Sequence, residues 1–376
     1  MRMIATVAHG PHRQPWPRLI TDEAGVALVV TLVVVMLVAI IVLELNYLMR
    51  VDVHASTNFR DGVKAYYLAK SGVTVVKELF SRDTQELEEL KDTLLAGGSH
   101  TLPIGEGSAT VRIIDETGKI NVNALVLDTA APQPAAGAQL PQAPQAAGAQ
   151  VGRAQRGGQS REPQAAQAVN PWIQPLQDLF QRLGIDPMLV GALVDWIDVD
   201  DVPTGGGGAE SSYYRGLEKP YRARNGAMET IAELRLIRGF TDEVLLKLGA
   251  RRVGGIIDPF TNLYLTAVPM PPGGSWRVNL NTAPVAILQS LTREMGQFAD
   301  AIVQQRSQHR IEKIDELQQV GVSGEALQDF QRLGTLSSLY YAVEARGTVG
   351  DMVKQITALI RTGGDQISQT LYWRVQ

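Results

Sequence analysis

The sequence of 376 residues contains no cysteine, and its five histidines are scattered. The lack of cysteine excludes a disulfide framework and thiolate metal sites. The net charge of −4 at pH 7 gives no overall attraction to nucleic acid or anionic lipid. None of the histidines has the spacing of metal ligands; they are His9, His12, His54, His100 and His309.

Charged residues are also absent from Val26 to Leu43, an apolar run in which Thr31 is the only hydroxyl side chain. A run of about 20 apolar residues crosses a bilayer as a helix. The basic residues before this run favour a cytoplasmic N-terminus, which places the bulk of the chain on the far side. We therefore predict a single-pass membrane anchor from Val26 to Leu43.

No small-residue cleavage site follows the anchor, as it would in a secretory signal peptide. Gly25 instead lies immediately before it. Cleavage between Gly25 and Val26 would remove residues 1–25 as a leader and retain the apolar helix. An uncut signal anchor is the alternative reading.

The segment after the anchor has the periodicity of one long helix. Proline is absent from Glu44 to Phe80, and apolar residues recur there every three or four positions. Residues 26–90 are therefore predicted to form one helix, with an apolar half followed by an amphipathic half.

Strand patterns lie on either side of a large central segment. Residues 108–115 alternate and are rich in β-branched side chains. Residues 340–346, 352–361 and 370–376 are separated by glycine-containing turns, which is typical of an antiparallel meander. The predicted fold class is α+β. A small pilin-like α/β domain is formed by residues 91–128 and 337–376 together with the long helix.

The central segment has two parts. Residues 129–169 are almost entirely Ala, Gln, Pro and Gly, so they bury too little apolar surface to order, and we predict a disordered loop. Residues 170–336 are predicted to be an all-α insertion domain. Residues 229–245 echo residues 312–327, with matching Ile-x-Glu-Leu and Gly positions. Two related helical units are therefore expected.

An acidic stretch inside the insertion suggests a metal site. Asp198, Asp200 and Asp201 lie at a predicted helix C-terminus, where the helix dipole disfavours negative charge. A glycine-rich loop, residues 205–208, precedes Glu210. Oxygen ligands on a flexible loop suit Ca²⁺. The four carboxylates are the predicted ligands, and a solvated acidic loop is the alternative.

The second helical unit raises the question of nucleic-acid binding. Its sequence resembles helix-hairpin-helix units of DNA-uptake proteins, which bind phosphate through backbone N–H groups. The first hairpin position, residues 291–295, lacks the glycine pair, and Ser323 replaces the final glycine of the second. We therefore expect a protein-binding or packing module and no nucleic acid. No catalytic triad or Walker loop is indicated by spacing, so no enzyme activity is predicted.

These features together resemble one family. Gly25-Val26-Ala27-Leu28 resembles the start of a type IV pilin-like protein. Further motifs resemble general secretion pathway protein K, the large minor pseudopilin of type II secretion; they are Gly118–Asn123, Leu193–Asp198, Tyr221–Asn225 and Val278–Pro284. The alternatives are a minor pilin of a type IV pilus and a membrane-tethered DNA receptor.

The resemblance implies several properties. A prepilin peptidase would cut after Gly25, with methylation of the new amine, and the mature protein would sit in the bacterial inner membrane. Its partners would be the other minor pseudopilins and the inner-membrane secretion platform. The resemblance also implies calcium binding in the helical domain, near the stretch that here reads Asp195-Trp196-Ile197-Asp198-Val199-Asp200-Asp201.

One position departs from most pilin-like proteins. They carry a glutamate five residues after the glycine, and that glutamate neutralises the terminal amine of a neighbouring subunit. Here the position is Val30. An unpaired charge inside the bilayer is expensive. The resemblance therefore predicts a subunit that caps the pseudopilus tip and helps to start its assembly.

Overall fold

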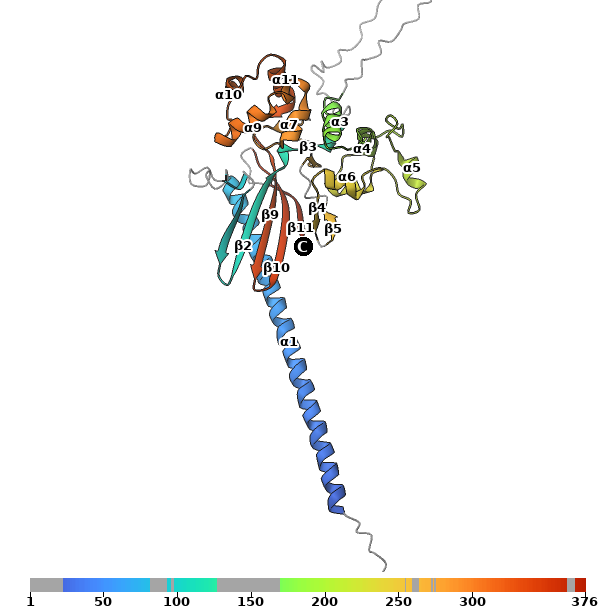
Figure 1. Ribbon diagram of the computed structural model, residues 1–376, viewed down its shortest axis with the longest axis vertical. Coiled ribbons are helices and arrows are strands. Elements are labelled where there is room, and N and C mark those ends of the chain that lie inside the picture. Colours follow the sequence, from blue (N-terminus) through green and yellow to red (C-terminus); the bar gives the residue numbers. More distant parts are fainter. Residues whose placement is uncertain are drawn as a thin grey trace, which may run out of the picture. The chain divides into compact units, whose positions relative to one another are not determined.

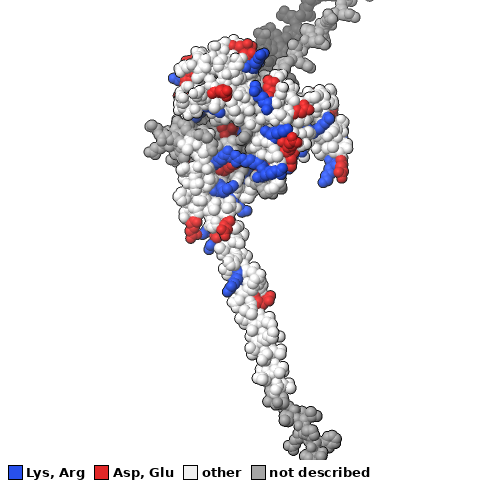
Figure 2. Space-filling view, viewed as in Figure 1, with Lys and Arg blue, Asp and Glu red and all other residues white. Residues whose placement is uncertain are grey.

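The computed structural model describes residues 23–81, 93–95, 98–126, 170–253, 255–258, 264–271, 273, 275–363 and 369–376. Helix α1 (Glu23–Ser81) is unbroken, which confirms the predicted long helix as far as Ser81. It is long and apolar enough to cross a membrane. Figure 2 shows its lower part without charged side chains. The predicted leader up to residue 22, the end of the predicted helix (82–90) and the predicted loop (129–169) lie outside the described residues.

A five-stranded antiparallel sheet follows α1, with the order β1-β2-β9-β10-β11. Its strands are β1 (Ser99–Ile104), β2 (Gly107–Asp115), β9 (Tyr340–Val349), β10 (Met352–Arg361) and β11 (Gln369–Val375). Figure 1 shows β2, β9 and β10 as neighbouring arrows. The four predicted strands are confirmed. The edge strand β1 was not predicted, because its mostly exposed side chains give no alternation between buried and exposed positions.

The second half of α1 packs closely against one face of this sheet. A Cβ atom on Gly72 would lie 2.9 Å from Cγ2 of Val111 on β2. A Cβ on Gly347 of β9 would collide with the carbonyl oxygen of Ala65. Both glycines therefore permit a close approach of helix and sheet. The shared core contains Ala69, Val73, Val76, Val111, Val343, Ala345, Ile356 and Ala358.

The insertion between β2 and β9 is mixed rather than all-α. Its helical elements are η1 (Glu116–Gly118), η2 (Val122–Leu125), α3 (Ile173–Arg182), α4 (Leu189–Ile197), α5 (Ser211–Arg215), η3 (Ile231–Leu236), α6 (Asp242–Lys247), α7 (Val285–Leu291), α8 (Arg293–Gly296), α9 (Ala299–Gln308), α10 (Ile314–Gln319) and α11 (Glu325–Leu333). Its strands are β3 (Ile120–Asn121), β4 (Arg251–Val253), β5 (Ile256–Asp258), β6 (Leu265–Thr266), β7 (Val278–Asn279) and β8 (Gly334–Thr335). The strands are too short for a sequence period to reveal them.

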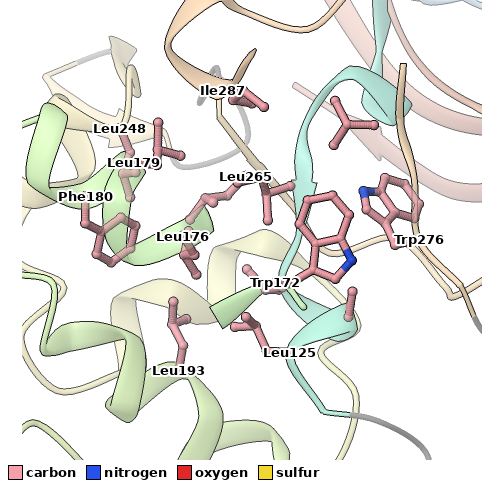
Figure 3. Packing of buried hydrophobic residues seen from close by; sticks show 14 of the residues in the cluster. Leu125, Trp172, Leu176, Leu179, Phe180, Leu193, Leu248, Leu265, Trp276 and Ile287 are labelled. Carbon is pink, nitrogen blue, oxygen red and sulfur yellow. The ribbon is translucent and has the colours of Figure 1, made fainter. Parts of the chain in front are cut away.

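The insertion also begins earlier than the predicted residue 170. Ile120, Val122 and Leu125 are buried in its core rather than in the core below the sheet. Figure 3 shows Leu125 and Trp172 close to side chains of α3, together with Leu265, Trp276 and Ile287. The first residues after β2 therefore belong to the insertion. They were assigned to the pilin-like domain because they are adjacent in sequence to a strand.

The insertion contains the same local arrangement twice. In the first helical unit, the Asn123 side chain accepts a hydrogen bond from Met228 N (2.7 Å) and donates to Met228 O (3.0 Å). In the second, Asn281 accepts from Ile311 N (2.9 Å) and donates to Ile311 O (2.9 Å). Each asparagine thus ties the start of its unit to the residue before a helical hairpin.

The hairpins correspond as well. Glu233 Oε1 accepts hydrogen bonds from the backbone N–H groups of residues 229 and 230. Glu316 Oε1 accepts from those of residues 312 and 313. Gly239 and Gly321 both have positive φ, which glycine adopts easily. Parallel pairs β3–β6 and β7–β8 close the units. The prediction of two related helical units is confirmed.

Candidate functional site

Asp195 is the centre of an acidic cluster in the first helical unit. It lies in the last turn of α4 and is fully buried. Its Oδ1 accepts a hydrogen bond from Thr204 N (2.8 Å), whereas Oδ2 is buried with no hydrogen-bond partner among the described residues. An unpaired buried carboxylate oxygen is costly, so the site calls for a cation.

Two further carboxylates face Asp195. Asp198 is the C-cap of α4, and Glu210 is the N-cap of α5 and only 1% exposed. One oxygen from each of the three residues lies within 4.8 Å of the others. Asp198 Oδ1 and both Glu210 oxygens are buried without a hydrogen-bond partner among the described residues.

Asn225 adds a neutral oxygen to this environment. Its φ of 48° is the only positive value for a non-glycine residue in the described part of the chain. Its backbone N–H donates to Trp196 O (3.0 Å), and its Nδ2 donates to Asp200 O (3.3 Å). Its buried Oδ1 has no partner among the described residues. Asparagine tolerates this conformation better than most residues do, and here the conformation fixes the amide beside the end of α4.

The glycine-rich loop closes over the carboxylates. A Cβ atom on Gly208 would collide with Asp195 Oδ2, so only glycine permits this packing. Arg238 Nη1 donates to Gly208 O (2.9 Å), and its guanidinium lies over the ring of Tyr213. The loop between α4 and η3 is thereby tied to the helical hairpin that follows it.

Two carboxylates of the cluster have raised pKa values, because they are buried and because the negative charges of the cluster repel one another. Burial raises the pKa of Glu210 to about 7, with a further increase from Asp195 and Asp198. Burial also raises the pKa of Asp198 to about 6, aided by Asp200 and Asp195. A divalent cation would remove both penalties.

The donor set fits a hard cation such as Ca²⁺. Its members are carboxylate and amide oxygens, and calcium binds oxygens at roughly 2.3–2.6 Å. Two oxygens on one ion then lie at most about 5 Å apart, which matches the observed grouping. Asp195, Asp198, Glu210 and Asn225 would hold the ion, and the ion would neutralise the cluster and fix the loop.

The predicted ligands divide into two pairs. Asp198 and Glu210 lie in the cluster, whereas Asp200 and Asp201 are exposed. Asp200 Oδ1 instead accepts a hydrogen bond from Val202 N (2.8 Å). Asp195 and Asn225 were missed. Asp195 could have been found as an acid in an otherwise apolar helix, three residues before Asp198. Asn225 ends one of the motifs that resemble the family, but no local signal marks it as a ligand.

The predicted processing site lies at the start of α1. Gly25 and Val26 fall within its first turn, and Val26 to Leu43 are exposed apolar residues. A helix with this surface is costly in water and suited to lipid. The predicted anchor and the acidic cluster belong to separate compact units, divided after Val63.

Comparison with known proteins gives a consistent result. Residues 118–250 match the family described as type II secretion system (T2SS), protein K. Type II secretion system protein K of Pseudomonas aeruginosa is 25% identical over 362 residues, covering 91% of this chain and 90% of that protein. The protein of the same name from Pectobacterium carotovorum is 27% identical over 198 residues, covering 51% of this chain and 55% of that protein.

A solved structure has a similar fold. It is a chain from the GspK-GspI-GspJ complex of the type 2 secretion system of enterotoxigenic Escherichia coli. The TM-score is 0.52 at 20% sequence identity, and the match covers 87% of this chain and 99% of that chain. The similarity therefore extends well beyond the family match at residues 118–250.

Proposed function

The chain belongs to the type II secretion system protein K family, a structural component of that secretion system, and on this premise we propose that it caps the tip of the pseudopilus and helps to start assembly. It is a minor pseudopilin of type II secretion. The long match to the Pseudomonas aeruginosa protein, which spans nine-tenths of both chains, carries this conclusion.

The tip position is supported by the charge pattern of α1. No acidic residue occurs from Val26 to Leu43, and the position five residues after Gly25 is Val30. This helix therefore offers no carboxylate to a neighbouring subunit's terminal amine inside the bilayer. Such a charge left unpaired costs ~2.5–3.5 kcal/mol on insertion scales. A subunit at the tip has no further subunit above it and avoids this cost.

Copy number tests the tip position. The full chain, labelled on an exposed residue, should be found once per pseudopilus and at one end. Labels at regular intervals along the shaft would contradict the proposal. A Val30→Glu variant supplies the missing acid, and Val33→Glu is its out-of-register control. If only V30E entered the shaft repeatedly, the missing charge alone would set the tip position.

We propose that maturation cuts the chain between Gly25 and Val26. Support comes from the retained apolar helix directly after Gly25. N-terminal sequencing of the membrane-extracted protein should begin at Val26, and a mass 14 Da higher would report methylation. A Gly25→Leu variant should remain uncut. A mature wild-type chain that starts at Met1, or beyond Leu43, would exclude this processing.

The partners are inferred to be two smaller minor pseudopilins, in a complex like that of GspK with GspI and GspJ. Among the described residues one helix is long and apolar enough to cross a membrane, which supports an inner-membrane position with the bulk of the chain in the periplasm. Protease added to spheroplasts should then digest the residues after Val63. Protection of that region would reverse the assigned orientation.

We also propose that the acidic cluster binds Ca²⁺. Five buried oxygens without hydrogen-bond partners among the described residues support a cation there. Tb³⁺ is a luminescent stand-in for Ca²⁺, and Trp196 beside Asp195 is a suitable sensitiser. Tb³⁺ luminescence of the full chain should be displaced by Ca²⁺ and lost in Glu210→Gln. It should persist in Glu218→Gln, a matched exposed acid. Equal signals from both variants would exclude the site.

A further inference from the structure

A cavity of about 610 Å³ lies where the second helical unit meets the sheet. Asp115 at the end of β2 and Tyr341 of β9 line it from the sheet. Arg306 and Val303 of α9 line it from the helical unit, together with Asn279 and Ser338. None of the residues in the acidic cluster contributes to it, so the cavity is separate from the proposed metal site.

Arg306 is an unusual cation in this chain. Its Nη1 donates to Leu280 O (2.5 Å), and it forms no ion pair with any residue that the structure describes. Burial lowers the pKa of Arg306. By contrast, the exposed Arg332 and the half-buried Arg374 pair with Asp329 and Asp258. A desolvated guanidinium with unused N–H groups is costly unless an anion accompanies it.

The nearby carboxylate does not serve as that anion. Asp115 Oδ1 accepts from Thr117 N (2.8 Å). Its Oδ2 accepts from the side chains of Asn279, Thr282 and Ser338. These four hydrogen bonds hold Asp115 as a junction between the sheet and the second unit. Burial raises the pKa of Asp115, and its hydrogen bonds from Ser338, Thr282, Thr117 and Asn279 act against that shift.

We propose that this cavity binds a carboxylate group, with the Arg306 guanidinium as its principal partner. A guanidinium and a carboxylate are both planar and can form two parallel hydrogen bonds. The adjoining Asp115 disfavours a doubly charged phosphate. The apolar side chains of Val303 and Leu95 accommodate the carbon atoms next to the carboxylate. The carboxylate belongs either to a free organic acid or to an acidic side chain of a neighbouring protein chain.

The free acid is tested by thermal unfolding of the full chain in detergent at constant Ca²⁺. Sodium succinate is the probe, sodium chloride matches the ionic strength, and succinamide is the uncharged control. Succinate at a hundredfold excess over its Kd should raise the Tm of wild type by about 5 °C, and succinamide should not. Arg306→Met should abolish the shift, whereas Arg332→Met should retain it.

The same variant separates ligand binding from a structural role. Without succinate, R306M should have a Tm close to that of wild type, because losing the hydrogen bond to Leu280 O is offset by removing a half-buried charge that has no ion pair among the described residues. A clear decrease in Tm would show that Arg306 supports the fold, and that result would overturn the proposal.

The protein-borne source is tested with Arg306→Lys, which keeps the charge and supplies an amine. Carbodiimide treatment of membranes should join that amine to an identified Asp or Glu of a neighbouring chain. Wild type is the control, since a guanidinium does not react. If succinate produces no shift and R306K forms no such bond, the cavity is not a carboxylate site. Because neither readout uses the tip position or the metal, failure here leaves the proposed function intact.

Discussion

The two helical units share a framework but differ in how their helices are connected. Both use an asparagine, Asn123 or Asn281, to hold the residue before the hairpin, and both cap the hairpin with a glutamate. In the second unit, residues 309–313 connect α9 to α10. In the first, the corresponding connection between α4 and η3 is the much longer segment 198–230.

The difference shows what a metal can contribute to a duplicated fold. Ordering a residue costs about 1–2 kcal/mol in conformational entropy, and the glycine-rich loop buries little apolar surface in return. The connection that contains this loop brings Asp198 and Glu210 together with Asp195 of α4 in one cluster of carboxylates. The negative charges of these carboxylates repel one another. A bound cation would neutralise them and hold the two ends of the connection together. The second unit has a short connection and no such need.

The largest expected effect comes from removing the cation. At a hundredfold excess over Kd, a bound ion stabilises the folded chain by ~2.7 kcal/mol. Chelator should therefore lower the Tm of wild type by several degrees. In Ca²⁺, Glu210→Gln should lose most of this stabilisation. In chelator, the same variant should be more stable than wild type, because it removes one of three repelling carboxylates.

This reversal of sign distinguishes a metal site from a solvated loop. Glu218→Gln, an exposed acid in the same connection, should have little effect under either condition. If E210Q changed stability equally with and without Ca²⁺, the cluster would hold no ion under these conditions.

Asn123 and Asn281 should contribute similar amounts to the free energy of unfolding. Asn123→Ala and Asn281→Ala each leave a buried backbone N–H and two carbonyl groups without their partner. An unsatisfied buried group costs about 1–3 kcal/mol, so each variant should lose about 2 kcal/mol in denaturant unfolding. If only one variant lost stability, the two asparagines would not play the same role in the two units.

Local sequence patterns were sufficient to predict much of the fold. The long helix, four strands and the echo between residues 229–245 and 312–327 all follow from periodicity or direct repetition. The two-residue strands β3 and β7 pair with segments far along the chain, and no local period encodes such contacts. Strand β1 has mostly exposed side chains, so its sequence does not alternate between apolar and polar residues.

The candidate site was only half accessible to sequence reasoning. Asp198 and Glu210 were found because acidic residues are dense there and glycines lie between them. Asp195 belongs to the same acidic stretch but was not chosen as a ligand. Asn225 lies beside the end of α4 only because the chain returns there, where its backbone N–H donates to Trp196 O. This return depends on the tertiary structure, and the spacing of residues in the sequence does not reveal it.

A change of pH should have a smaller effect on stability, and the direction of that effect should differ with and without Ca²⁺. Without metal, the pKa of Asp198 is raised to about 6 and that of Glu210 to about 7. The folded chain then binds more protons than the unfolded chain, so stability should fall as pH rises from about 4 to about 7. With Ca²⁺, protons compete with the ion and stability should rise over that window. Tm measured from pH 4 to 8 in chelator and in Ca²⁺ checks both slopes. Parallel slopes would contradict the assignment.

The smallest effect is expected at the exposed acids of the loop. Asp200→Asn and Asp201→Asn keep the side-chain shape and lie outside the cluster. Each should change Ca²⁺-dependent stability by less than about 0.5 kcal/mol. A loss as large as that of E210Q would restore them as ligands and show that the loop closes further around the ion.

Hydrogen exchange of the full chain, with Ca²⁺ and with chelator, compares the two units most directly. Peptides from α4 to α6, residues 189–247, should exchange much more slowly with Ca²⁺. Peptides from α7 to α11, residues 285–333, should exchange at similar rates in both conditions. Equal protection of both units by Ca²⁺, or protection of neither, would contradict the account of a metal-dependent first unit beside a metal-independent second one.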